Sequence, residues 1–209
     1  MPIEALIFDL GGVIVPFDDD AMLRRLAGRC TAPAALEQIL AEASDDRYGS
    51  GELPVEHLHR RLVDELGYAE GWETFARDFC SHLDIDWRML ELVETLAERH
   101  RVLLFSNTTG PHWAHLVAAT SGRLARLEPQ LSFELGAVKP DPVAFARVIA
   151  RTRVDPGRTL FVDDRADNVE AGRAAGLQAH QFTGIAALTE HLRAAGVTWP
   201  ERAELESIR

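Results

Sequence analysis

The sequence has few cysteines. Cys30 and Cys80 are the only two, they lie far apart, and neither belongs to a CxxC pattern or has a neighbouring histidine that would complete a zinc pattern. A disulfide framework or a zinc site is therefore disfavoured. The two residues are instead typical of reduced thiols in a reducing compartment.

Long apolar runs are also missing. No stretch approaches the ~18–20 apolar residues that a membrane-spanning helix requires. Residues 1–4 carry no basic region ahead of the short apolar stretch that follows, which disfavours a secretory signal. We therefore expect a cytoplasmic protein without a membrane partner.

Basic residues are scarce relative to acidic ones. The 209 residues include 22 Lys+Arg and 33 Asp+Glu, for a formal net charge of −11. Sequence-independent binding to DNA or RNA depends largely on Lys and Arg that neutralise phosphates, so we expect no nucleic-acid partner. With 46% apolar and 26% charged residues, the composition is that of an ordinary globular protein. The length allows either one large domain or a core with an inserted smaller unit.

Short apolar runs that are rich in β-branched residues predict strands. They occupy residues 5–8, 102–105 and 159–162, with weaker candidates at 131–135 and 178–182. Helical patterns separate them at residues 142–151, 168–175 and 185–195. This alternation, with short connections, favours an α/β fold: a doubly wound, Rossmann-like parallel sheet with helices on both faces.

The alternation breaks between the first two predicted strands. Residues 17–99 contain no convincing strand, but the segments around 22–27, 55–66 and 89–96 each place apolar residues at the 3.6-residue helical period. We therefore expect two units: a catalytic core formed by residues 1–16 and 100–209, and a helical insert formed by residues 17–99.

Polar residues gather where the predicted strands end. In chain order they are Asp9 with Gly11, then Ser106 and Asn107, then Lys139, and finally Asp163 and Asp164. The carboxyl ends of parallel strands meet at one edge of the sheet, which is where ligands bind. Together these residues would supply a carboxylate nucleophile, carboxylates for a hard cation, and donors for anionic oxygens.

Each of these residues also has a purely structural interpretation. Asp9 could open a turn, Ser106 could cap a helix, Lys139 could be a solvated surface charge, and Asp163 and Asp164 could cap the helix that follows them. The conjunction favours a ligand, because strand ends that collect both carboxylates and an amine suit a polyanion with a metal ion.

Four segments resemble, in the right order, the motifs of the haloacid dehalogenase superfamily: IFDLGGVI at residues 7–14, LFSNT at 104–108, GAVKPD at 136–141 and FVDDRADN at 161–168. The insert is similar to the helical cap of the first subclass. The closest pattern is that of the sugar-phosphate phosphatases and the epoxide-hydrolase N-terminal domains. The resemblance implies a phosphatase of a small phosphorylated metabolite, with a sugar phosphate as one candidate, acting as a monomer or homodimer.

The resemblance also implies a mechanism. Asp9 would attack phosphorus and become an aspartyl phosphate that water later cleaves. Mg²⁺ would be held by Asp9, the backbone carbonyl of Gly11 and Asp164, with Asp163 as a further ligand or as a residue that orients the others.

Other residues would bind the substrate. Ser106 and the amide of Asn107 would hold phosphoryl oxygens, and Lys139 would offset the charge that spreads over them. In the insert, residues 47–51 resemble the segment that meets substrate in this branch, although an ordinary loop between helices would have the same composition.

Gly11 departs from the family pattern. Most phosphatases of the superfamily have a second Asp at this position, which protonates the leaving group, and the loss of such help is worth about 10²–10⁴ in rate. Asp18, Asp19 or a side chain of the insert are candidates for a substitute.

Gly11 also leaves two other functions open. A 2-haloacid dehalogenase requires neither a metal nor this acid, although Asp163 and Asp164 are hard to explain there without a metal. A catalytically impaired protein could keep the site for phosphate binding or regulation.

Overall fold

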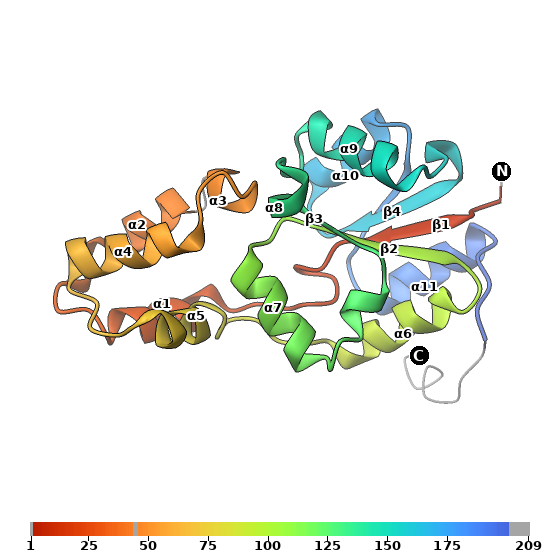
Figure 1. Ribbon diagram of the computed structural model, residues 1–209. Helices are drawn as coiled ribbons and strands as arrows, with labels where there is room; N and C mark the ends of the chain where they lie inside the picture. The colour runs from red at the N-terminus through yellow and green to blue at the C-terminus, as the bar shows by residue number, and fades with distance from the viewer. Residues whose placement is uncertain (1, 44–45, 201–209) are drawn as a thin grey trace.

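The computed structural model describes residues 2–43 and 46–200, and within them five strands form one parallel sheet (Figure 1). The strands are β1 (Ala5–Phe8), β2 (Arg101–Ser106), β3 (Pro129–Leu131), β4 (Thr159–Asp163) and β5 (Gln178–Gln181). Their order is β3-β2-β1-β4-β5, and every neighbouring pair is parallel. The chain winds outward from β1 to β3 and then returns to the other side of β1, so the predicted doubly wound α/β fold is confirmed.

One predicted strand is wrong. Of residues 131–135, only Leu131 lies in β3, and the rest form the short helix α8 (Ser132–Leu135). Gly136 ends this helix with a left-handed φ of 69°. A short apolar run does not by itself distinguish a buried strand from a buried helical turn, which is why the pattern misled.

Helices cover both faces of the sheet (Figure 1). One face carries α6 (Trp87–Ala97), α7 (Gly110–Ala119) and α11 (Ile185–Ala194), and the other carries α8, α9 (Pro142–Thr152) and α10 (Ala166–Ala174). Alternate residues of β1 supply both cores, because side chains of a strand point to opposite faces in turn. Leu6 and Phe8 belong to the first core, and Ala5 and Ile7 to the second. The short 3-10 helices Leu124–Arg126 and Pro156–Arg158 precede β3 and β4.

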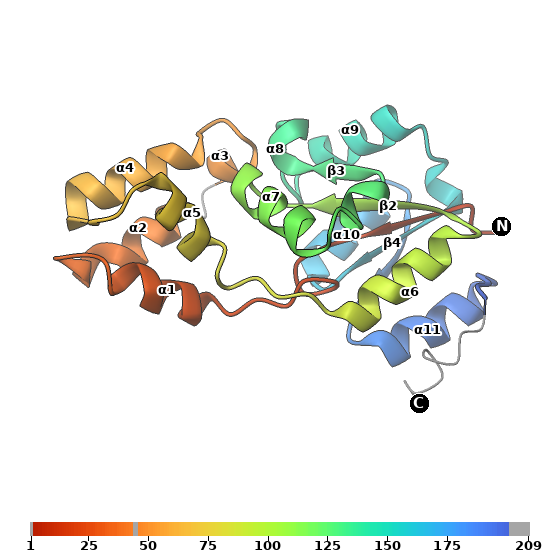
Figure 2. The same cartoon turned by 60° about the horizontal axis from the view of Figure 1, so that its bottom comes forward.

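The remaining helices form a separate group beside the sheet (Figure 2). They are α1 (Asp19–Ala27), the 3-10 helix Pro33–Ala35, α2 (Leu36–Ala43), α3 (Asp46–Gly49), α4 (Val55–Leu66) and α5 (Trp72–Phe79), which we call the helical layer. Its own hydrophobic cluster includes Leu26, Leu58, Leu62 and Phe75, each at most 1% exposed. Among the described helices, none is long and apolar enough to cross a membrane.

The expected end of the insert at residue 99 is too late. In α6, Met89, Leu92 and Val93 are buried in the same cluster as Leu6 and Phe8 of the central strand. Helix α6 thus packs on the sheet and not on the helical layer. The helical period shows that α6 buries one face, but it does not show against which partner.

Two chain segments connect the helical layer to the sheet, and they run side by side (Figure 2). Phe17 and Leu83 form an antiparallel bridge. The backbone N–H of Asp18 donates to the carbonyl of His82 at 2.9 Å, and that of Asp84 donates to Pro16 at 3.0 Å. This pairing, which we call the hinge, brings the segment around His82 next to the turn that follows β1.

Close packing of α10 on the sheet yields a first prediction. A Cβ atom added to Gly172 would lie 2.7 Å from Cδ1 of the buried Phe161. We expect Gly172→Ala to lower the free energy of unfolding by about 1–3 kcal/mol in urea denaturation, because overpacking outweighs the gain in helix propensity.

Gly28→Ala is the matched control. Gly28 has an ordinary right-handed backbone, and its added Cβ would come no closer than 3.4 Å to another atom. We expect it to be neutral or slightly stabilising. Equal effects of the two substitutions would contradict the packing argument.

Candidate active site

The turn after β1 presents Asp9 at the carboxyl edge of the sheet. The Asp9 amide continues the strand pairing by donating to Val162 at 2.9 Å, and its side-chain Oδ1 accepts from the Leu10 amide at 2.7 Å. Gly12 adopts a φ of +67° and donates to the Val15 carbonyl at 3.0 Å, which closes the turn. The Asp9 residue is only 7% exposed.

Lys139 joins three strands through its side chain. Its Nζ lies 2.9 Å from Oδ1 of Asp9 and 2.6 Å from Oδ2 of Asp163, and it donates to the Phe105 carbonyl at 2.8 Å. The same nitrogen lies 5.1 Å from the ring centroid of Phe105 and 5.5 Å from that of Phe161. Lys139 is 3% exposed, so the interpretation of a solvated surface charge is wrong.

Asn107 positions Lys139. Its side-chain amide donates to the Lys139 carbonyl at 2.7 Å, and its Oδ1 accepts from the Lys139 backbone N–H at 2.8 Å. The two hydrogen bonds fix the segment that carries the lysine, so the Asn107 side chain is engaged within the protein.

The acidic pair after β4 lies beside Asp9. Ligand atoms of Asp9, Asp163 and Asp164 all lie within 4.8 Å of one another. Asn168 donates to both carboxylate oxygens of Asp163, at 3.0 and 3.1 Å, and the Arg165 amide donates to Oδ1 at 3.0 Å. Asp163 is thus held firmly in place. Arg165 and not an acidic residue is the N-cap of α10, although Asp163 does accept from the backbone N–H of Arg165 at the start of this helix.

Burial dominates the electrostatics of this acidic cluster. It raises the pKa of Asp9 to about 6; the ammonium of Lys139 lowers it, and the charge of Asp163 raises it further. Burial and Asp163 also raise the pKa of Asp164. Three carboxylates therefore share a single ammonium, which leaves excess negative charge in a poorly hydrated place.

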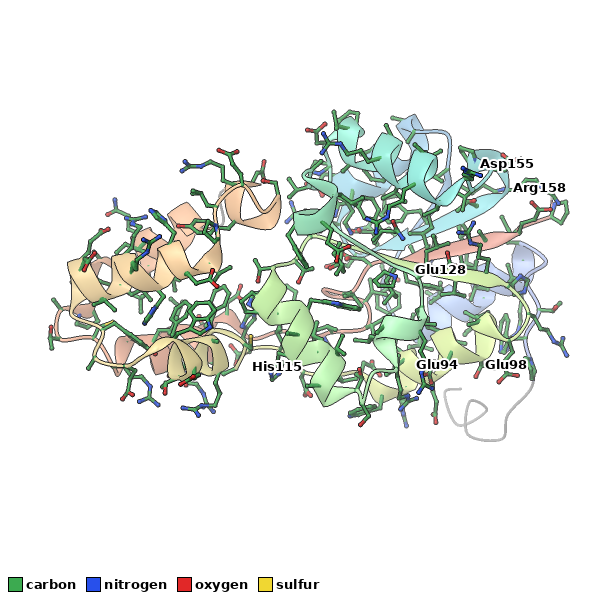
Figure 3. All side chains as sticks on the ribbon, in the orientation of Figure 1. Glu94, Glu98, His115, Glu128, Asp155 and Arg158 are labelled. Atoms are coloured by element: carbon green, nitrogen blue, oxygen red, sulfur yellow. The ribbon has the colours of Figure 1, made fainter. Side chains whose placement is uncertain are left out.

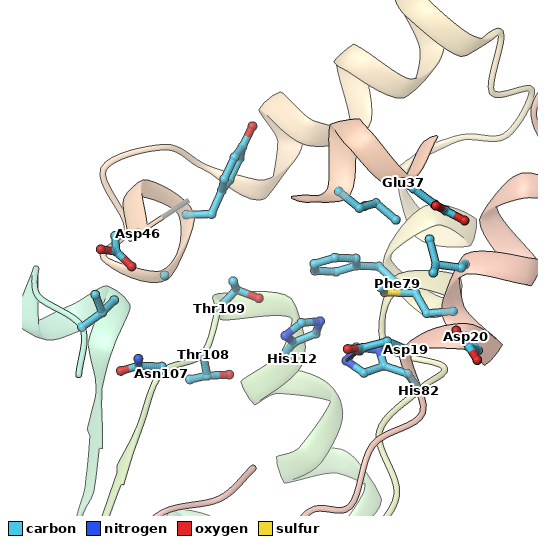
Figure 4. A pocket seen from close by; sticks show the side chains of 16 residues that line it. Asp19, Asp20, Glu37, Asp46, Phe79, His82, Asn107, Thr108, Thr109 and His112 are labelled. Atoms are coloured by element: carbon cyan, nitrogen blue, oxygen red, sulfur yellow. Dashed lines mark ion pairs between the residues drawn. The ribbon is translucent and has the colours of Figure 1, made fainter. Parts of the chain in front are cut away.

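Two cavities lie over this edge of the sheet. The small cavity, about 230 Å³, is lined by Gly11, Ser106 and Asn107 together with residues of the hinge. The large cavity, about 640 Å³, lies between the sheet and the helical layer (Figure 4). All seven residues predicted for the site thus lie at one edge of the sheet. Four of them form what we call the Lys139 cluster, namely Lys139, Asp9, Asp163 and Asp164, and the other three line the small cavity.

The predicted link at residues 47–51 is partly helical. Its first three residues belong to α3, and Tyr48 and Gly49 line the large cavity. The Ser132 hydroxyl lies 2.6 Å from the Gly49 carbonyl and accepts from the Thr108 amide at 2.9 Å, which ties the helical layer to the end of β2.

Sequence reasoning did not identify several residues of the cavity walls. His82 and His112 line both cavities, and Thr109 lines the large one. Thr109 is the N-cap residue of α7, but its hydroxyl makes no capping hydrogen bond. No spacing in the sequence links His82 to Gly11, because the hinge that joins them is a tertiary contact.

Comparisons with known proteins identify the family of this chain. Residues 3–176 match the model of the haloacid dehalogenase-like hydrolase family. D-ribitol-5-phosphate phosphatase of Bacteroides thetaiotaomicron is 27% identical over 190 residues, which cover 86% of this chain and 91% of that protein.

Solved structures show the same fold. A predicted HAD-like family hydrolase from Porphyromonas gingivalis superposes with a TM-score of 0.79 and 25% identity, over 92% of this chain and 99% of that one. A HAD family enzyme from Bacteroides thetaiotaomicron, in complex with magnesium and inorganic phosphate, has a TM-score of 0.74 and 22% identity, over 86% and 93% of the two chains. Since the family model spans all four motif segments, this chain belongs to the haloacid dehalogenase-like hydrolases.

Proposed function

We propose that this hydrolase is a Mg²⁺-dependent phosphatase of a small phosphorylated metabolite, with a transient aspartyl phosphate on Asp9. The observation that carries the proposal is the cluster itself. A buried carboxylate sits at the end of the central strand, 2.9 Å from a buried lysine and beside two further carboxylates.

Asp9 is placed to act as a nucleophile. The Leu10 amide and the Lys139 ammonium both contact Oδ1, so the carboxylate is fixed through one oxygen and the other can react. A bond from Asp9 to phosphorus would form as the ester P–O bond breaks. Water would then attack the phosphorus and regenerate the carboxylate.

The residues at this edge fit a Mg²⁺ ion. Asp9, Asp163, Asp164 and the Gly11 carbonyl offer only oxygen ligands, which Mg²⁺ prefers. A Cβ atom on Gly12 would lie 2.3 Å from Oδ2 of Asp164, so a glycine is needed for that carboxylate to lie so close. When bound, the ion would neutralise the carboxylates and polarise a phosphoryl oxygen.

Ser106, Asn107 and Lys139 would bind the phosphoryl group. Ser106 ends β2 and is 3% exposed, and it shares the small cavity with Gly11. The positive charge of Lys139 would offset the charge on the transferring oxygens. The small cavity would therefore hold the phosphoryl end of the substrate.

The large cavity would hold the rest of the substrate, with the helical layer acting as a cap over it. Its described walls include the carboxylates of Asp19, Asp20, Glu37 and Asp46 but no lysine or arginine (Figure 4). Carboxylates accept hydrogen bonds from hydroxyl groups and repel a second anionic group. This wall favours a sugar or sugar-alcohol phosphate, and the similar D-ribitol-5-phosphate phosphatase supports that class.

The two alternative functions explain less of the structure. A 2-haloacid dehalogenase would leave Asp163 and Asp164 as buried negative charge without a purpose. A phosphate-binding or regulatory protein would account for Gly11, but it would not require a nucleophile held through one oxygen beside Lys139.

The excess negative charge gives a stability prediction that needs no substrate. The folded-state pKa of Asp9, about 6, lies above its ordinary value of 3.8, so ionising Asp9 costs stability as the pH rises from about 4 to about 6. Without divalent ions, we expect Asp9→Asn to be more stable than the wild type at pH 7.5 by about 1–3 kcal/mol. At pH 4 this advantage should largely vanish, as measured by urea denaturation in EDTA.

Asp64→Asn is the control for this measurement, because Asp64 is exposed on α4. Its substitution removes one exposed carboxylate and leaves Asp9, Lys139, Asp163 and Asp164 intact, so we expect little effect on stability. Mg²⁺ should stabilise the wild type at pH 7.5 more than it stabilises Asp9→Asn. If the difference in unfolding free energy between the wild type and Asp9→Asn is the same at pH 7.5 as at pH 4, the charge argument is wrong.

The activity prediction concerns Asp9 and the metal. Wild-type protein with Mg²⁺ should release phosphate from p-nitrophenyl phosphate and from sugar phosphates, and EDTA should abolish this turnover. Asp9→Asn should lower kcat at least about 10³-fold, since the nucleophile is lost, while Asp64→Asn keeps wild-type rates. Metal-independent halide release from a 2-haloacid would instead identify a dehalogenase. Phosphate binding without turnover would identify a binding protein.

A further inference from the structure

Gly11 leaves the site without the side chain that usually protonates the leaving group in this family. An alkoxide leaves slowly unless its oxygen is protonated. A proton donor must therefore lie next to the ester oxygen, between the phosphoryl group and the rest of the substrate. In this structure that place is the junction of the two cavities.

Five residues line both cavities and thus mark that junction: Asp19, His82, Asn107, Thr108 and His112. Only Asp19, His82 and His112 have ionisable side chains. Figure 4 shows Asp19 and His82 side by side, with His112 next to them.

The hinge brings the segment of His82 to the small cavity that Gly11 also lines. Phe17 pairs with Leu83, and the amide of Asp18 donates to the His82 carbonyl at 2.9 Å. A Cβ atom on Gly11 would lie 3.7 Å from Cε1 of Phe17. The backbone of residues 82–83 is thus fixed next to the turn where the family acid is missing.

The His82 ring is buried and incompletely hydrogen-bonded. Its side chain is 8% exposed, and Nε2 lies 4.0 Å from Oδ1 of Asp19. Nδ1 is buried and makes no hydrogen bond of good geometry among the described residues, although the Phe79 carbonyl lies close enough to the ring to raise the pKa of His82. A buried polar atom without a partner is costly, and an ester oxygen at the cavity junction would supply one.

Charge distinguishes His82 from His112. Burial and the neighbouring His82 lower the pKa of His112 to about 3, so His112 stays neutral at physiological pH. Burial also lowers the pKa of His82, but Asp19, the backbone carbonyl of Phe79 and Asp18 act in the opposite direction, against His115 on α7. A phosphoryl dianion in the small cavity would add negative charge and favour the imidazolium form of His82.

We propose that His82 is the general acid and base of this site and that Asp19 positions its ring. The proposal rests on the phosphatase function. In the first step, the His82 imidazolium gives its proton to the ester oxygen as the Asp9–phosphorus bond forms and the ester bond breaks, which releases the alcohol. In the second step, neutral His82 takes a proton from the water that attacks phosphorus, which releases phosphate and restores Asp9 and the imidazolium.

Substrates with different leaving groups test this role. For ribitol 5-phosphate, whose leaving alkoxide needs a proton, His82→Gln should lower kcat/KM about 10²–10³-fold. For p-nitrophenyl phosphate, whose leaving group needs none, kcat/KM should change less than about fivefold. The second step should become slow, so His82→Gln should release a burst of p-nitrophenol equal to the enzyme concentration.

Asp19→Asn should also lower kcat/KM for ribitol 5-phosphate more than for p-nitrophenyl phosphate, but only by about tenfold. The Asp19 side chain is exposed, so the fold should tolerate this substitution. His100→Gln is the matched control, because His100 lies two residues after Glu98 at the end of α6 (Figure 3) and lines neither cavity. It should leave both substrates within about twofold.

Equal losses of kcat/KM for both substrates in His82→Gln, or the absence of a burst, would overturn the proposal. Failure of the wild type to turn over p-nitrophenyl phosphate would instead overturn the phosphatase function itself. The two failures are therefore distinguishable.

Discussion

The ammonium of Lys139, buried between the carboxylates of Asp9 and Asp163, is the interaction on which the site depends. It joins the ends of β1, β2 and β4 and compensates only part of the negative charge that these strands bring together. A single ammonium among three carboxylates leaves a site that favours a divalent cation, and a cation with a lysine favours a phosphoryl group. The parallel sheet is what brings the strand ends close enough for this to happen.

The structure divides the chemistry between two units. The sheet carries Asp9, the proposed nucleophile, and the charged groups around it, whereas the helical layer and the hinge carry the walls that would contact the leaving group. Gly11 lies where the two units meet. It has no side chain, and Phe17 of the hinge, which pairs with Leu83, lies next to it. A change in the hinge would therefore alter the leaving-group side of the site without disturbing the Lys139 cluster.

Much of this arrangement could be predicted from the sequence. The runs at residues 5–8 and 159–162 are buried in the sheet, and strand ends in a parallel sheet necessarily meet, so the grouping of Asp9 with Asp163 followed from topology. Lys139 follows the short helix α8 and not a strand, so its place in the group rested on the motif resemblance. The assignment of α6 to the insert was wrong, because helical periodicity does not identify the packing partner. The strand predicted at residues 131–135 was wrong, because a short apolar run fits both a strand and a helical turn. His82 was out of reach, since only the hinge, a tertiary pairing, brings it to Gly11.

The most direct test of the account is whether Asp9 becomes phosphorylated during turnover. Protein that is hydrolysing p-nitrophenyl phosphate with Mg²⁺ would be quenched in acid, digested and examined by peptide mass spectrometry. The account predicts a phosphoryl adduct on Asp9 that is absent after EDTA treatment. Turnover with a phosphoryl adduct on another residue would contradict the account. So would the absence of any adduct in His82→Gln, in which the phosphorylated intermediate should accumulate.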